Sequence, residues 1–229
     1  LHLLSRRQRQ MCIRDRLYNK QRHFVENAAH ELQTPLAVCM NKLELLSEHP
    51  DCTEDQLKEI AGLHQALNGI IRLNKSLLLL SRIDNKQFPE TRDICLNHLI
   101  HKILEGINDI YERKALHLRV SEKESLVCTM NESLATTLIT NLIKNAYVHN
   151  YEKGDIGITI SRRMLTIANT GIDKTLDKEL LFARFASQSK QQESTGLGLA
   201  IVKSIVDLYS IRIDSVSYTH LRAHETKAN

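Results

Sequence analysis

A histidine, an acid and a threonine occur at fixed offsets early in the chain, just ahead of a proline. They are His30, Glu31 and Thr34, followed by Pro35. Helical residues four apart share a face, so His30 and Thr34 are expected side by side on the solvent side of a helix. A neutral imidazole is a nucleophile for phosphoryl groups, and an adjacent carboxylate can take its proton or hold its tautomer. The spacing predicts a phosphate-accepting histidine rather than a merely solvated one.

Proline at position 35 is expected to loosen the helix beside this histidine. It has no N–H to donate, and its ring clashes with the carbonyl four residues earlier, that of Glu31. We therefore expect a bend or a weakened turn at the reactive residue, which would suit a segment that moves.

Two asparagines form a second cluster, Asn141 and Asn145, in the run Asn-Leu-Ile-Lys-Asn-Ala. They too are four apart, on a helix whose other face is apolar. An amide oxygen is a hard ligand that suits Mg²⁺, which takes one or two protein oxygens beside nucleotide phosphates. The alternative is a pair of solvated or capping asparagines, and taken alone this cluster does not exclude it.

A third cluster, Gly196-Leu197-Gly198, opens an apolar helix. Glycines there let backbone N–H groups approach a phosphate, and a helix N-terminus favours anions. An ordinary helix start is the competing interpretation, and Lys203 fits either a phosphate contact or a surface charge. The order of the three clusters, acceptor histidine, metal-nucleotide site and glycine-rich phosphate loop, indicates a protein that phosphorylates its own histidine.

Bulk composition is compatible with this prediction and excludes several other classes. The chain has 229 residues, 42% of them hydrophobic, a net charge of only +4 and no tryptophan. The mild, dispersed charge does not imply nucleic-acid binding. Five widely spaced cysteines without a Cys-x-x-Cys are expected to be reduced and mostly buried. No apolar run approaches the roughly 20 residues that span a bilayer.

Two helices that pair as a hairpin are expected to carry the histidine. Apolar residues alternate by four and three over 17–47 and again, after a break at 48–52, to about residue 84. Thr53 and Gln56 fit a capping box for the second helix. The polar seam residues His64, Asn74 and Ser81 suggest register-setting positions. Two such hairpins would pair into a dimeric four-helix bundle.

Beyond a linker, the pattern mixes helices and strands without strict alternation, which favours an α+β sandwich over a doubly wound parallel sheet. The expected elements are a helix over 97–114, strands at 116–121 and 126–129, a helix capped by Asn131 that runs to 148, a strand hairpin at 155–161 and 164–168, a polar segment at 171–195, a helix over 196–209, and the start of a strand at 210–214.

These patterns predict two domains between two foreign ends. Residues 1–16 are expected to be foreign sequence or linker, and 216–229 a foreign tail of the kind that translated sequencing adaptor produces. The expected domains are a dimerisation and phosphotransfer hairpin at 17–84, a linker at 85–92, and an ATP-binding catalytic domain at 93–215.

The three clusters resemble the H, N and G2 boxes of bacterial two-component sensor histidine kinases. Phe182-Ala-Arg-Phe185 looks like the F box of that family, and Asn169-Thr170-Gly171 occupies the G1 position. The resemblance covers roughly residues 20–215. It implies a catalytic domain of the fold shared with gyrase and heat-shock-chaperone ATPases, with ATP and Mg²⁺ as cofactors. It also implies a homodimer formed through the hairpin, and a response regulator receiver domain as partner.

By the same resemblance, each candidate residue has an expected role. His30 would be the phosphoacceptor, Glu31 the assisting acid/base, and Thr34 the residue that orients water when the regulator is dephosphorylated. Metal and nucleotide roles fall to a further set: Asn145 on Mg²⁺ with Asn141 in support, and Asn169, Gly171, Gly196 and Gly198 around the adenine and phosphates.

The chain departs from the family pattern at two places. Asn169 stands where an Asp usually bonds the adenine amino group, and a second glycine is missing, so adenine recognition is expected to be weakened or differently satisfied but not lost. Val148 stands where a basic residue often follows the second Asn. Lys144 or His149 could supply that charge, and the sequence leaves both open.

The expected function is autophosphorylation on His30 from ATP, followed by transfer to an aspartate of a response regulator, with possible regulator phosphatase activity. The alternative is a degenerate member that binds nucleotide weakly and acts mainly as a dimeric binding module or phosphatase. Family members usually carry membrane spans upstream, so the resemblance places this chain on the cytoplasmic side of an inner-membrane protein.

Overall fold

The computed structural model describes residues 27–29, 31–171, 181–185 and 196–216, apart from the side chains of residues 108, 109 and 113. Contacts divide the chain into two compact units, one formed by 1–88 with 187–204 and the other by 89–186 with 205–229. Within the described residues, no helix is long and apolar enough to cross a membrane.

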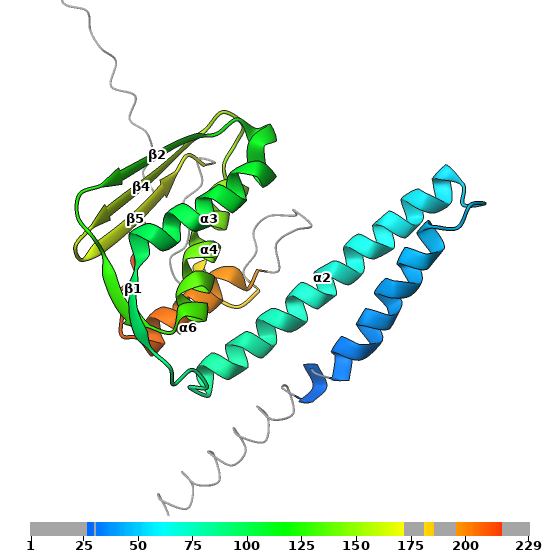
Figure 1. Ribbon diagram of the computed structural model, residues 1–229, viewed down its shortest axis with the longest axis horizontal. Coiled ribbons are helices and arrows are strands. Elements are labelled where there is room, and N and C mark those ends of the chain that lie inside the picture. Colours follow the sequence, from blue (N-terminus) through cyan, green and yellow to red (C-terminus); the bar gives the residue numbers. More distant parts are fainter. Residues whose placement is uncertain (1–26, 30, 172–180, 186–195, 217–229) are drawn as a thin grey trace, which may run out of the picture. The chain divides into compact units, whose positions relative to one another are not determined.

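A helical hairpin makes up most of the first unit. Residues 31–47 form one continuous helix that includes Pro35, and α2 spans Glu54–Asp84. Figure 1 shows the two helices side by side and antiparallel, joined by a short turn. The predicted capping box is confirmed, because Thr53 Oγ1 accepts from the backbone N–H of Gln56 over 3.3 Å and Gln56 Oε1 accepts from that of Thr53 over 2.9 Å.

Burial along the hairpin is uneven. The C-terminal half of α2 is buried at Asn74, Leu78, Leu80, Ser81 and Ile83. On the first helix, by contrast, the seam residues Leu32 and Leu46 remain 50% and 55% exposed. One hairpin therefore leaves a large part of its apolar surface uncovered.

Mixed helices and strands make up the second unit. In chain order they are β1 (Arg92–Cys95), α3 (Leu96–Tyr111), a 3₁₀ turn (Glu112–Lys114), β2 (His117–Glu122), β3 (Val127–Met130), α4 (Glu132–Val148), β4 (Asp155–Ser161) and β5 (Met164–Asn169). A last helix, α6 (Gly198–Leu208), begins among residues grouped with the first unit and ends among residues grouped with the second.

A three-stranded sheet organises the second unit, in the order β2-β4-β5. β4 runs parallel to β2 and antiparallel to β5, while β1 and β3 form a separate antiparallel pair. Ile156, Ile158 and Ile160 of β4 alternate with less buried residues and are almost fully buried. α3 and α4 lie together on one side of this sheet (Figure 1). The predicted α+β class is confirmed.

Several details of the sequence prediction were wrong. β1 was not expected, and α3 ends at Tyr111 with a 3₁₀ turn where a helix to 114 was expected. Residues 210–214 do not start a strand, because 211–216 have no regular structure. None of the four described cysteines is buried; Cys39 and Cys95 are exposed, and Cys52 and Cys128 are half-buried.

Candidate phosphoacceptor and nucleotide site

The segment predicted to accept phosphate lies at the start of the described helix of the hairpin. His30 itself lies outside the described residues. Glu31 and Thr34 are both exposed on the helix over 31–47. Both side chains are therefore open to solvent.

The two asparagines of the second cluster lie on successive turns of α4, and both are half-buried. Asn141 Nδ2 donates to the carbonyl of Thr137 over 2.8 Å, so its amide is turned with Oδ1 away from that carbonyl. Among the described residues, the Asn145 side chain has no hydrogen-bond partner. Each thus retains an amide oxygen that is free to accept a further bond or to bind a cation.

Asn169 ends β5, and its amide has one defined orientation. Its Nδ2 donates to the carbonyl of Thr170 over 2.8 Å. A carbonyl can only accept, so the NH₂ group must face it and Oδ1 must point elsewhere. The exposed oxygen can accept a bond from an amino group such as that of adenine.

The end of α4 and the segment after β5 are joined by a polar network. Thr170 Oγ1 donates to Asn150 Oδ1 over 2.6 Å and accepts from the backbone N–H of Asp155 over 2.9 Å. Asn150, which is 7% exposed, also donates to the carbonyl of Asp155 over 3.1 Å. A Cβ added to Gly154 would lie 2.1 Å from Asn150 Oδ1 and 2.3 Å from Thr170 Oγ1, so a larger residue there would have to displace this bonded pair.

This network brings the predicted G1 segment, 169–171, against the helix that carries the second cluster. A Cβ added at Gly171 would lie 3.8 Å from the carbonyl oxygen of His149, which follows α4, and 3.7 Å from Asn169 Nδ2. The segment 169–171 therefore lies against the C-terminal end of the helix that carries Asn141 and Asn145. Sequence reasoning missed Asn150 and Gly154, whose only signal was the polar turn Asn-Tyr-Glu-Lys-Gly.

Lys114 closes the C-terminal end of α4. Its Nζ donates to the carbonyls of Tyr147 and Val148 over 2.9 Å each, and to that of Asn150 over 3.1 Å. The last carbonyls of a helix have no partner within it and carry partial negative charge, so a cation is favourable there. Sequence reasoning missed Lys114 as well, because 33 to 36 positions separate it from its partners.

The same lysine bears on the charge of His149. Partial burial of the imidazole lowers the pKa of His149, and the positive charge of Lys114 lowers it further. His149 as a whole remains exposed. The lowered pKa favours the neutral form of His149. Val148 stands where the family often has a basic residue, and Lys144 or His149 could supply that charge instead. The neutral form of His149 favours Lys144, which is exposed on α4.

The glycine-rich segment is described by its own geometry. Gly196 has a φ of 67°, a left-handed conformation that glycine adopts without penalty, and Gly198 is the first residue of α6. Leu197 between them is fully buried, while Lys203 is exposed. Residues 196–204 group with the hairpin, so the second unit unites Asn141, Asn145, Asn169 and Gly171 without Gly196 and Gly198.

The residues of the second unit fit a magnesium nucleotide. Asn141, Asn145 and Asn169 each have an amide oxygen without a partner among the described residues, which is the donor chemistry that a hard cation and an amino group require. Of the F-box candidates, Phe182 is half-buried and Phe185 is 60% exposed with a φ of 64°, which is uncommon for a bulky residue.

Comparison with known proteins identifies two families in succession. Residues 20–86 match the His Kinase A (phospho-acceptor) domain, and residues 130–226 match the ATPase family of histidine kinases, DNA gyrase B and HSP90. The second match extends into the segment predicted to be a foreign tail.

Individual curated proteins that resemble this chain are sensor proteins. The chain is 34% identical over 209 residues to the heme sensor protein HssS of Staphylococcus saprophyticus, covering 87% of this chain and 45% of that protein. It is 32% identical over 198 residues to the sensor protein CiaH of Streptococcus pneumoniae, covering 82% and 44%. The chain thus spans less than half the length of these relatives.

The fold has a counterpart among solved structures. Full-length ShkA, solved in complex with AMPPNP, matches 81% of this chain and 41% of its own, with a TM-score of 0.67 and 20% identity. With a phosphoacceptor domain followed by a histidine kinase-type ATPase domain, the chain belongs to the sensor histidine kinases and represents their transmitter region.

Proposed function

We propose that this chain phosphorylates His30 from ATP and passes the phosphoryl group to an aspartate of a response regulator. The observation that carries the proposal is the order of the two matched domains, with the His-Glu-Leu-Gln-Thr-Pro segment in the first and the paired asparagines in the second. Neither domain would account for both features alone.

Each residue of the acceptor segment has a proposed role in this reaction. Bound ATP supplies the γ-phosphoryl group. The imidazole of His30 would act as nucleophile, and the exposed Glu31 would hold its tautomer or take its proton. Thr34, exposed one turn further on, would act on the phosphorylated regulator.

Asn145 would hold Mg²⁺ through its amide oxygen, with Asn141 in support. Asn169 would accept from the adenine amino group through Oδ1, since its Nδ2 is engaged by the Thr170 carbonyl. Gly171, Gly196 and Gly198 would let backbone approach the nucleotide.

The surface that one hairpin leaves open supports a homodimer formed through the hairpin. Val38 and Leu45 are 49% and 69% exposed on the first helix, and Leu63 and Ile70 are 55% and 48% exposed on α2. Each pair is seven positions apart, so each forms a stripe on one helical face. Such stripes are buried when a second helical pair packs on them.

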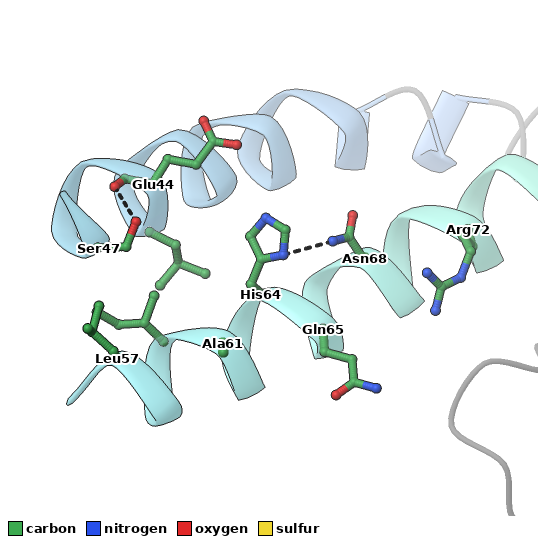
Figure 2. Close-up of a pocket in the computed structure, with 10 residues that line it drawn as sticks. Glu44, Ser47, Leu57, Ala61, His64, Gln65, Asn68 and Arg72 are labelled. Carbon is green, nitrogen blue, oxygen red and sulfur yellow. Dashed lines mark hydrogen bonds between the residues drawn. The ribbon is translucent and has the colours of Figure 1, made fainter. Parts of the chain in front are cut away.

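A groove lies between the two helices and is lined by residues of both. It has a volume of about 490 Å³ and mixes polar with apolar walls, among them Glu44, Ser47, Leu57 and His64 (Figure 2). Asn68 Nδ2 lies 3.0 Å from His64 Nδ1, so the ring is held by its own helix. We expect the second hairpin of the dimer to complete this part of the bundle.

The test is incubation with γ-labelled ATP and Mg²⁺. Label should enter the wild-type chain, resist alkali and be lost in acid, as a phosphoramidate is. His30→Ala should take no label yet bind ATP normally, because the proposed nucleotide residues all lie within the matched ATPase domain, residues 130–226. Label that persists in His30→Ala would refute the assignment.

The competing function is a degenerate kinase that binds nucleotide weakly and acts mainly as a dimeric binding module or phosphatase. The replaced residues at Asn169 and Val148 motivate it. It predicts wild-type protein that dimerises but takes no label at millimolar ATP. The location inferred from the resemblance, the cytoplasmic part of an inner-membrane protein, stays a proposal.

A further inference from the structure

A buried polar contact ties the two helices of the hairpin together one residue before His30. Asn74 of α2 is 5% exposed, and its Nδ2 donates to the main-chain carbonyl of Ala29 over 2.6 Å. Ala29 is itself only 4% exposed. Both partners are therefore shielded from water, where a hydrogen bond is strong and its loss leaves an unpaired group.

The chemistry of Ala29 makes this contact possible. Its side chain is a single methyl group, so the short Asn74 side chain can reach the backbone. A main-chain carbonyl has two lone pairs, so it can accept from Asn74 as well as from an N–H of its own helix. The carbonyl belongs to the peptide that joins residue 29 to residue 30. Asn74 thus fixes the height and rotation, relative to α2, of the peptide that leads into the acceptor.

An apolar residue at this seam position would avoid the free-energy cost of burying a polar amide. Asn74 follows the seam residue Ile71 and precedes Leu78, both of which are apolar. A buried Asn between paired helices lowers stability, but it specifies register because only one alignment satisfies it. The residue is therefore better suited to setting a geometry than to strengthening the hairpin.

Pro35 weakens the first helix close to the contact made by Asn74. Pro35 cannot donate to the carbonyl of Glu31, so the first helix lacks one of its own hydrogen bonds just after residue 30. The contact from Asn74 supports the same helix just before residue 30. We propose that Asn74 is a positioning residue for the phosphoacceptor, which holds the backbone before His30 in one register against α2.

This inference rests on the proposed phosphorylation of His30, and two variants test it. Asn74→Leu keeps a similar volume without a donor, and Asn74→Asp keeps the shape without the N–H. For Asn74→Leu we expect an unchanged or higher melting temperature, an autophosphorylation rate at saturating ATP lowered by about tenfold or more, and an unchanged KM for ATP. Asn74→Asp should also lose rate.

Asn68→Leu is the matched control. It removes a half-buried amide from the same helix, but the partner of Asn68 is His64 of that helix, not the first helix (Figure 2). Its rate should stay within about twofold of wild type. A normal rate in Asn74→Leu, or an equal loss in Asn68→Leu, would overturn the inference.

A second readout does not depend on kinase activity. Hydrogen exchange of backbone amides in the peptide 27–36 should speed up by about tenfold or more in Asn74→Leu, while amides of 40–46 keep their wild-type rates. A wild-type chain that takes no label would contradict the proposed function, and this exchange contrast would still decide the role of Asn74. Equal exchange in Asn74→Leu and wild type would overturn it.

Discussion

An amide and a carboxylate present different faces to a nucleotide base. A carboxylate only accepts, whereas the amide of Asn169 could accept from the adenine amino group or, turned over, donate to the carbonyl of guanine. The bond from Asn169 Nδ2 to the carbonyl of Thr170 favours the accepting orientation. Since Asn169 is exposed, that bond holds the amide only weakly.

Substitution of Asn169 should therefore change the choice of base. Asn169→Asp removes the donor and should raise the preference for ATP over GTP by about tenfold, roughly 1.4 kcal/mol. Asn169→Ala should reduce the preference toward none. Competition binding with both nucleotides measures the ratio. Asn68→Asp makes the same chemical change in the hairpin and should leave it unaltered; a ratio insensitive to both Asn169 variants would exclude this residue from base recognition.

Thr34 offers a separation of two activities. It is exposed on the helix that follows His30. We expect transfer from ATP not to require its hydroxyl. Thr34→Ala should retain autophosphorylation within about threefold and lose regulator dephosphorylation by about tenfold or more. Both rates come from one labelled preparation, before and after addition of regulator. If both fell together, Thr34 would be structural, with its hydroxyl bonded to the nearby backbone.

Residue types and local spacing predicted part of the candidate site. The spacing of Asn141 and Asn145 correctly predicted that they lie on successive turns of one helix, because the helical period is fixed, while their role as ligands stays a prediction. Lys114, Asn150 and Gly154 were missed because their roles depend on partners distant in sequence or on the space around a missing Cβ. Local patterns do not encode such contacts.

At the scale of elements, the turn between α4 and β4 is held by several contacts. Gly154 lies there against two side chains that are bonded to each other, Asn150 and Thr170. Gly157, on β4 itself, has nothing within 4 Å of an added Cβ. The same substitution at these two positions therefore separates a steric effect from a general glycine effect.

Gly154→Ala should lower the free energy of unfolding by about 2 kcal/mol, because the new methyl group must displace the bonded pair. Gly157→Ala should be neutral or slightly stabilising, since a strand position gains from losing glycine. Thermal melting distinguishes them, with a shift of several degrees expected for the first alone. Comparable melts would mean that the 150–154 turn relaxes without cost.

Elements with their own start and stop signals were predicted closely. Thr53 and Asn131 cap α2 and α4 as expected, because capping is a contact within a few residues. β1 escaped notice since its four residues gain order only by pairing with β3. The alternating residues at 210–214 predicted a strand that does not form, because they have no strand to pair with among the described residues. Ile211 N–H bonds to Val206 at the end of α6.

At the scale of the whole molecule, the hairpin determines the assembly that we expect. Burial along α2 increases toward its C-terminal end at Leu78, Leu80 and Ile83, yet the stripes formed by Val38 with Leu45 and Leu63 with Ile70 remain open. Apolar stripes of this length are unfavourable in water unless a partner covers them. A second copy of the same hairpin carries the same stripes, and in a two-fold dimer the same surface on each subunit forms the interface.

Placing charge on one stripe should therefore separate the subunits. Leu63→Lys combined with Ile70→Lys would bury two ammonium groups without partners in each hairpin, which a bundle core does not tolerate. We expect monomers by light scattering at concentrations where the wild-type chain is dimeric. ATP affinity should be unchanged, because the proposed nucleotide residues lie within the matched ATPase domain, residues 130–226. Glu59→Lys adds the same net charge at an exposed polar position of α2 and should stay dimeric. A double variant that remained dimeric would place the dimer interface elsewhere on the chain.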